Sequence, residues 1–162
     1  HRSDFLDQGK AIRLCADALY TASSIPANPP EPIVSKIKRN CLLSRNKQLF
    51  DQAGQVFGRW WMFDDSEMFL KKSEALDPQS PNTLMSLAVT YHLSRNPEKE
   101  LPILRRYLKI DPSNPQALRL GTQVAGMLKN REFANDVLNL MEQHNPALLD
   151  LAKKFIDDAF AN

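Results

Sequence analysis

Apolar residues recur at helical spacing along most of the chain. In the stretch from 81 to 95 they fall at positions i, i+3, i+4 and i+7, as in a helix that buries one face: Leu84, Leu87, Ala88 and Tyr91. Asn96 and Pro97 follow as a favoured N-cap and a favoured first helical residue. Alternating Val, Ile and Thr runs with Asn-Gly turns, which would mark strands, are missing from the sequence. The pattern predicts an all-α protein.

Three short phrases that end in proline recur along the chain. They are Leu76-Asp77-Pro78, Ile110-Asp111-Pro112 and His144-Asn145-Pro146, and their prolines lie 34 residues apart. That period is typical of tetratricopeptide repeats, in which helix–turn–helix units stack on one another. The chain therefore resembles the tetratricopeptide repeat (TPR) family over residues 47 to about 160, with repeats at 47–80, 81–114 and 115–148.

The three repeats differ in how well they match this family. Gly54 and Ala88 occupy the position in the first helix where the family has a small residue. In the second repeat Glu100 stands where the family has a small alanine, whereas the third repeat has Ala134 there. Pro102 removes an amide donor from the same helix, so we expect that helix to start irregularly or to be kinked.

The segments on either side of the repeats are also helical in pattern. Residues 3–24 and 32–45 predict two helices on either side of a proline-rich loop, and therefore a helical hairpin over 1–46 that we interpret as a degenerate repeat. Residues 149–162 predict a capping helix with an apolar face that includes Leu148, Leu151, Ala152, Phe155 and Ala159. The expected fold is a right-handed helical solenoid of TPR-like helix pairs with an N-terminal hairpin and a C-terminal cap.

Cys15 and Cys41 lie at similar distances from the loop of the predicted hairpin, so they should sit at similar heights on its two helices. A disulfide between them would stabilise the hairpin by about 3 kcal/mol and would favour an oxidising compartment. The alternative is a pair of buried, reduced cysteines that pack as small apolar residues. The location is accordingly left open between the cytoplasm and, if the cysteines are bonded, the periplasm.

Composition and motifs give no sign of catalysis. With 43% hydrophobic residues, 25% charged residues and a formal net charge of +2, the sequence is an ordinary globular one. It lacks the glycine-rich phosphate loop, the dinucleotide fingerprint, the nucleophile elbow and zinc-ligand spacing. A basic stretch at 32–50 lacks interleaved aromatic residues, so we expect no nucleic-acid partner. We also expect no enzyme activity, no metal and no cofactor.

The resemblance implies a concave groove lined by the first helices of successive repeats, at the second, fifth, sixth, ninth, twelfth and thirteenth positions of each. The candidate groove residues are Gln48, Asp51, Gln52, Gln55, Arg59, Asn82, Met85, Ser86, Val89, His92, Gln116, Arg119, Gln123 and Met127. Because amides both donate and accept hydrogen bonds, this lining suits an extended peptide or a helix. The Lys, Asn and Arg clamp with which chaperone-binding members hold a terminal carboxylate is missing.

The turn of the first repeat carries a candidate aromatic patch of Trp60, Trp61 and Phe63. Exposed aromatic residues often anchor interfaces. The alternative is that one tryptophan packs between the hairpin and the second repeat and the other is partly covered. We expect Asp64 or Asp65 to cap the helix that follows.

The predicted function is a protein-interaction scaffold that binds a peptide or a helix of a partner protein. The alternative is a soluble regulatory or docking domain of a larger membrane-bound machine for surface glycans or secretion. That alternative needs a membrane anchor in a missing upstream segment, which the first residue, histidine rather than methionine, led us to expect. Self-association through an exposed end of the solenoid, giving a homo-oligomer, is a third hypothesis.

Overall fold

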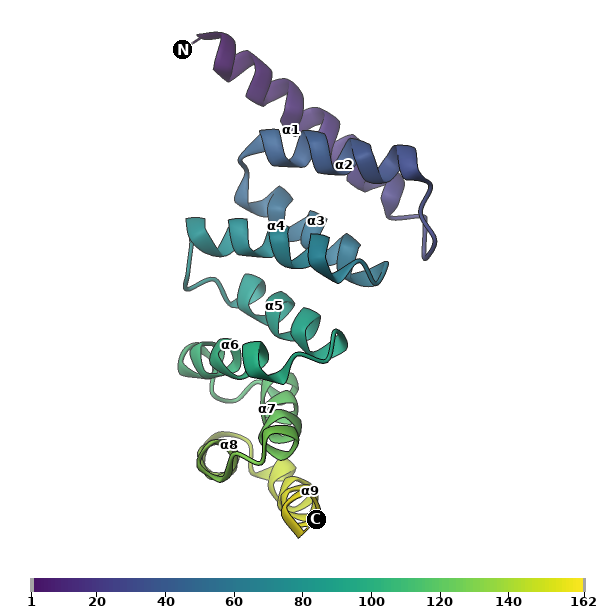
Figure 1. The fold of residues 1–162 in the computed structure, drawn as a ribbon. Helices are drawn as coiled ribbons and strands as arrows, with labels where there is room; N and C mark the ends of the chain where they lie inside the picture. Colours follow the sequence, from purple (N-terminus) through teal and green to yellow (C-terminus); the bar gives the residue numbers. More distant parts are fainter. Residues whose placement is uncertain (1, 162) are drawn as a thin grey trace. The chain divides into compact units, whose positions relative to one another are not determined.

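The structure, a computed structural model, describes residues 2–161, with side chains from Leu6 onward. Every regular element in that range is helical, and the range contains no strand, which confirms the predicted all-α class. The chain divides into two compact units, an N-terminal unit over His1–Pro78 and a C-terminal unit over Gln79–Asn162. Within each unit, helices that follow one another in the sequence pack together (Figure 1).

The N-terminal unit is formed by α1 (Arg2–Ala22), α2 (Glu31–Ser44), α3 (Lys47–Arg59) and α4 (Phe63–Leu76). Helices α1 and α2 form the predicted hairpin, both pack on α3, and α3 packs on α4. Aromatic side chains fill the core between α3 and α4, where the rings of Phe57 and Phe69 stack with their centroids 5.7 Å apart.

The C-terminal unit is formed by α5 (Pro81–Leu93), α6 (Pro97–Ile110), α7 (Pro115–Leu128), α8 (Arg131–His144), the 3-10 turn η1 (Pro146–Leu148) and α9 (Leu149–Ala161). Helices α5 to α8 pack in sequence order. The last helix, α9, packs on both α7 and α8. It therefore covers one end of the preceding helix pair, as a capping helix does.

Local backbone structure recurs at the 34-residue spacing of the prolines. The N-caps of α3, α5 and α7 are Asn46, Ser80 and Asn114. Left-handed residues follow the same three helices, with φ of 62° at Trp61, 59° at Arg95 and 53° at Lys129. A backbone N–H···O=C bond closes each turn: Met62 to Phe57, Asn96 to Tyr91 and Asn130 to Ala125. A helix–turn–helix arrangement therefore repeats along the chain.

The starts of the second helices α4 and α6 can be compared with the sequence-based expectations. Helix α4 begins at Phe63 after Met62 and has no side-chain cap, so the prediction that Asp64 or Asp65 caps it is wrong. Both aspartates lie instead in its first turn, where negative charge suits the positive end of the helix dipole. Helix α6 begins at its first proline as expected, and it continues through Pro102 to its end.

Small residues allow close helix packing at two places. A Cβ atom on Gly54 would lie 2.5 Å from Cγ of Leu70, so α3 and α4 approach too closely for any side chain there. Ser66 Oγ of α4 donates to the Gly54 carbonyl at 2.7 Å across the same contact. In the C-terminal unit a Cβ on Gly126 would lie 3.1 Å from the ring of Phe155, which shows how closely α9 crosses α7.

The hairpin is closed by a disulfide between Cys15 of α1 and Cys41 of α2, with the two Cα atoms 4.8 Å apart. Both cysteines are fully buried in the core of the N-terminal unit. Of the two alternatives that the sequence left open, the structure has the bonded one. Arg59 Nη2 of α3 also donates to the Ala22 carbonyl at 3.1 Å, which ties α3 to the end of α1.

Candidate functional site

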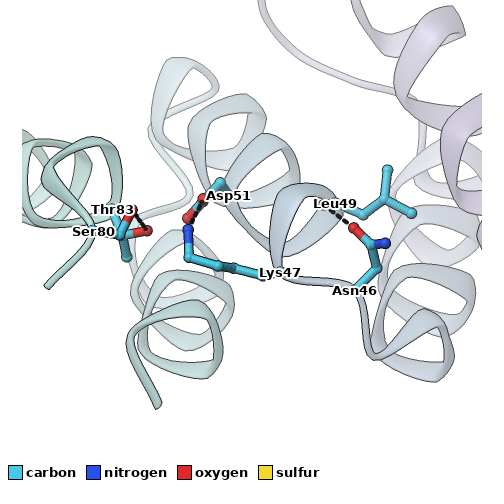
Figure 2. A network of polar contacts seen from close by, with 6 residues as sticks. All are labelled: Asn46, Lys47, Leu49, Asp51, Ser80 and Thr83. Atoms are coloured by element: carbon cyan, nitrogen blue, oxygen red, sulfur yellow. Dashed lines mark hydrogen bonds and ion pairs between the residues drawn. The ribbon is translucent and has the colours of Figure 1, made fainter. Parts of the chain in front are cut away.

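Some candidate groove residues of α3 are exposed, and one is buried in an ion pair. Gln48, Gln52 and Gln55 are exposed. Asp51 is buried, and its carboxylate pairs with Lys47 Nζ at 2.9 Å (Figure 2). Arg59 is exposed as well. Because a buried, paired carboxylate stabilises the fold, the three amides and Arg59 are the candidate groups of α3 that a partner can reach.

Three of these residues line a pocket of about 370 Å³ between α1 and α3: Gln52, Gln55 and Arg59. Tyr20 of α1 contributes to the same pocket, and its side chain is 83% exposed. Tyr20 was not among the residues predicted from the sequence, because the hairpin was assigned no role in binding. The sequence feature that could have indicated it is a large aromatic residue next to Leu19, which belongs to the buried stripe of α1.

The second set of candidate residues lies on α5 and α7. Gln116, Arg119 and Met127 of α7 are exposed, and Gln123 is partly buried. On α5, Asn82 is exposed and four others are partly buried: Met85, Ser86, Val89 and His92. Their accessible faces are made of amides, a hydroxyl, apolar side chains, one guanidinium and one imidazole, and they contain no carboxylate.

A second pocket, of about 210 Å³, lies beside this set among α7, α8 and α9. Its lining combines Arg119 and Gln123 with apolar side chains of α9, including Leu151 and Phe155. The capping helix was expected to present Leu151 and Phe155 on its apolar face, but Leu151 is 78% exposed and Phe155 43%. Ala152, which was predicted on the same face, is buried as expected, together with Ile156. The predicted face is therefore only partly buried, and Leu151 and Phe155 lie at the pocket.

A buried carboxyl group lies behind the α5 residues. Glu100 of α6 is fully buried, and its Oε1 lies 3.3 Å from Nδ1 of His92. Its other oxygen, Oε2, lies 3.2 Å from the same Nδ1 and makes no hydrogen bond with any described residue. Burial raises the pKa of Glu100 to about 8, and burial also lowers the pKa of His92. Both shifts favour the neutral forms at neutral pH, and in that state the Glu100 carboxyl group would donate to Nδ1 of His92.

The residues of the candidate aromatic patch differ in exposure. Trp60 is buried, and its Nε1 donates to the Ile25 carbonyl of the hairpin loop at 2.8 Å. Trp61 is 67% exposed and meets Phe63 edge-to-face with ring centroids 5.4 Å apart. The patch therefore reduces to Trp61 and Phe63, while Trp60 joins α3 to the hairpin.

The basic stretch at 32–50 is partly neutralised by neighbouring acids. Lys38 pairs with Asp65 at 3.1 Å, and Lys47 pairs with Asp51. Among the residues that the structure describes, no group of three or more His, Cys, Asp or Glu side chains is arranged to hold a metal ion. No helix in the same range is both long and apolar enough to cross a bilayer.

The fold and these surfaces define an all-helical protein built from consecutive helix pairs, with pockets beside the first helices α3 and α7. No protein-family model, no curated protein and no solved structure matches the chain.

Proposed function

We propose that this chain is a TPR-like scaffold that binds a peptide or a helix of a partner protein. The observation that carries the proposal is the 34-residue recurrence of N-caps, left-handed residues and turn hydrogen bonds, which is the spacing of that repeat family. Polar and apolar side chains on the exposed faces of α3, α5 and α7 are the kind that recognise a polypeptide backbone and its side chains.

Introducing negative charge on the first helices tests the proposal. Met85→Glu combined with Arg119→Glu places two carboxylates on α5 and α7, and it should abolish capture of the partners that the wild-type protein retains from a cell extract. Neither side chain is fully buried, so helicity measured by circular dichroism should not change.

The matched control carries the same change in net charge on the second helices. Lys109→Glu with Gln143→Glu alters two exposed residues of α6 and α8. The control should retain the partners. Equal capture by all three proteins, or equal loss in both variants, would overturn the proposed binding face.

A second candidate function is a docking or regulatory domain of a larger membrane-bound machine for surface glycans or secretion. The Cys15–Cys41 disulfide favours it, because such bonds persist mainly in oxidising compartments. The test is alkylation of thiols in intact cells before and after reduction. This function predicts cysteines that react only after reduction, and free thiols in cells would exclude an oxidising location.

A further inference from the structure

The pocket among α7, α8 and α9 combines an apolar interior with a single cation at its edge. Met141 of α8 is buried at the pocket, and Leu148, Leu151 and Phe155 supply apolar walls. Arg119 and Gln123 of α7 are the long polar side chains of its lining. Its volume of about 210 Å³ suits one large apolar side chain.

The apolar walls are accessible although they are large. Leu151 is 78% exposed and Phe155 is 43% exposed, whereas Ala152 between them is buried. Gly126 lets the Phe155 ring lie against α7, because a Cβ there would approach the ring to 3.1 Å. The aromatic wall of the pocket is thus held in place by backbone packing, and exposed aromatic and aliphatic anchors of this kind favour protein interfaces.

The charge of α7 restricts what occupies the pocket. Arg119 is the single charged residue in the whole of α7, Pro115–Leu128. Its guanidinium forms no ion pair or hydrogen bond with any residue in the described range. The candidate groove residues on α5 and α7 include no acidic residue. An arginine with five donors beside an apolar pocket is complementary to a carboxylate next to an apolar side chain.

We propose that this pocket takes one large apolar side chain from a helix or peptide of a partner protein, with an Asp or Glu one helical turn away paired with Arg119. Gln123 is placed to hydrogen-bond the backbone or a polar side chain of the same segment. This inference rests on the proposed scaffold function and specifies the chemistry of the segment that is bound.

The test uses a random library of 12-residue peptides displayed on phage and selected against the wild-type protein. Selected sequences should pair Leu, Phe, Ile or Met with Asp or Glu three or four positions away. The leading peptide is then synthesised, and its affinity is measured by fluorescence anisotropy. Arg119→Glu and Leu151→Asp should each weaken it about tenfold or more. A peptide with Lys in place of the acid should bind Arg119→Glu better than it binds the wild type.

Lys109→Glu on α6 is the control for the change in net charge, and it should bind the peptide as the wild type does. Selected peptides without an acid, or peptides that bind Arg119→Glu and Leu151→Asp normally, would overturn the pocket but leave the scaffold function standing. A selection that enriches no sequence at all would overturn both.

A second copy of the chain is the competing occupant. Wild-type protein that dimerises in sedimentation experiments, with dimerisation lost in Leu151→Asp, would show that the pocket is a self-association surface and would overturn the proposal of a foreign segment.

Discussion

Glu100 occupies a position where the neighbouring repeats have small residues. Ser66 and Ala134 lie one period before and after it, and all three are fully buried. The Ser66 hydroxyl donates to the Gly54 carbonyl. Both carboxyl oxygens of Glu100 face the single nitrogen Nδ1 of His92, and Oε2 makes no hydrogen bond among the described residues. Such a group is stable as the neutral acid and costs free energy when it ionises.

This difference predicts a pH-dependent stability. The folded pKa of Glu100 is about 8, above its ordinary 4.5, so the native state keeps a proton that the unfolded state loses, and stability falls as pH rises between these values. The lowered pKa of His92 acts in the opposite direction, but only below its ordinary 6.5. Between pH 6.5 and 8.5 the wild type should lose about 2 kcal/mol of unfolding free energy.

Glu100→Gln should remove this loss, because the amide imitates the neutral acid and does not titrate. The measurement is urea unfolding at pH 6.5 and 8.5, followed by circular dichroism. Glu98→Gln on the same helix is the control, because Glu98 is exposed, and it should behave as the wild type does. An unchanged pH dependence in Glu100→Gln would contradict the assignment.

At the scale of helices, the contact between α3 and α4 depends on the absence of a side chain at Gly54. Glycine in a helix interior ordinarily destabilises it relative to alanine by up to about 1 kcal/mol, so a glycine retained there indicates a packing requirement. The requirement comes from Leu70 of α4, because its Cγ atom would lie 2.5 Å from a Cβ atom at position 54.

We therefore predict that Gly54→Ala destabilises the protein by about 1–2 kcal/mol, because the clash with Leu70 exceeds the gain in helix propensity. Thermal and urea unfolding measure this change.

Gly9 of α1 provides the matched control. A Cβ there would have Arg13 Nη1 as its nearest neighbour, 4.0 Å away, so Gly9→Ala adds propensity without a clash. It should stabilise the protein by about 0.5–1 kcal/mol. Stabilisation by both substitutions would show that α3 and α4 can separate at no cost.

At the scale of the whole molecule, the disulfide belongs to one of the two compact units. Cys15 and Cys41 are buried with the apolar side chains of α1 to α4, in the N-terminal unit. The bond closes a loop across a sequence separation of 26 residues. In the loop-entropy description, closing such a loop stabilises the folded state by about 3 kcal/mol.

Reduction should therefore increase amide hydrogen exchange in the helices of the N-terminal unit, while exchange in α5 to α9 stays unchanged. Exchange followed by mass spectrometry, with and without a phosphine reductant, measures the effect. The double variant Cys15→Ala with Cys41→Ala is the control and should not respond to the reductant. Equal loosening of both units would contradict a local role for the bond.

The sequence by itself predicted the helical class of this protein, the two helices of its N-terminal hairpin and the start of α6 at Pro97. The reason is that the apolar stripes, the N-caps and the recurrent prolines act within a few residues of the backbone that they shape. The candidate groove residues named from the sequence lie on the helices α3, α5 and α7.

Only the tertiary structure decided which candidate side chains are accessible and which are committed. Asp51 is buried and paired with Lys47, and Cys15 is bonded to Cys41. Trp60 is buried, whereas Trp61 is exposed. Leu151 and Phe155 lie at a pocket beside Arg119. These outcomes depend on contacts between helices, which the apolar pattern of a single helix does not specify.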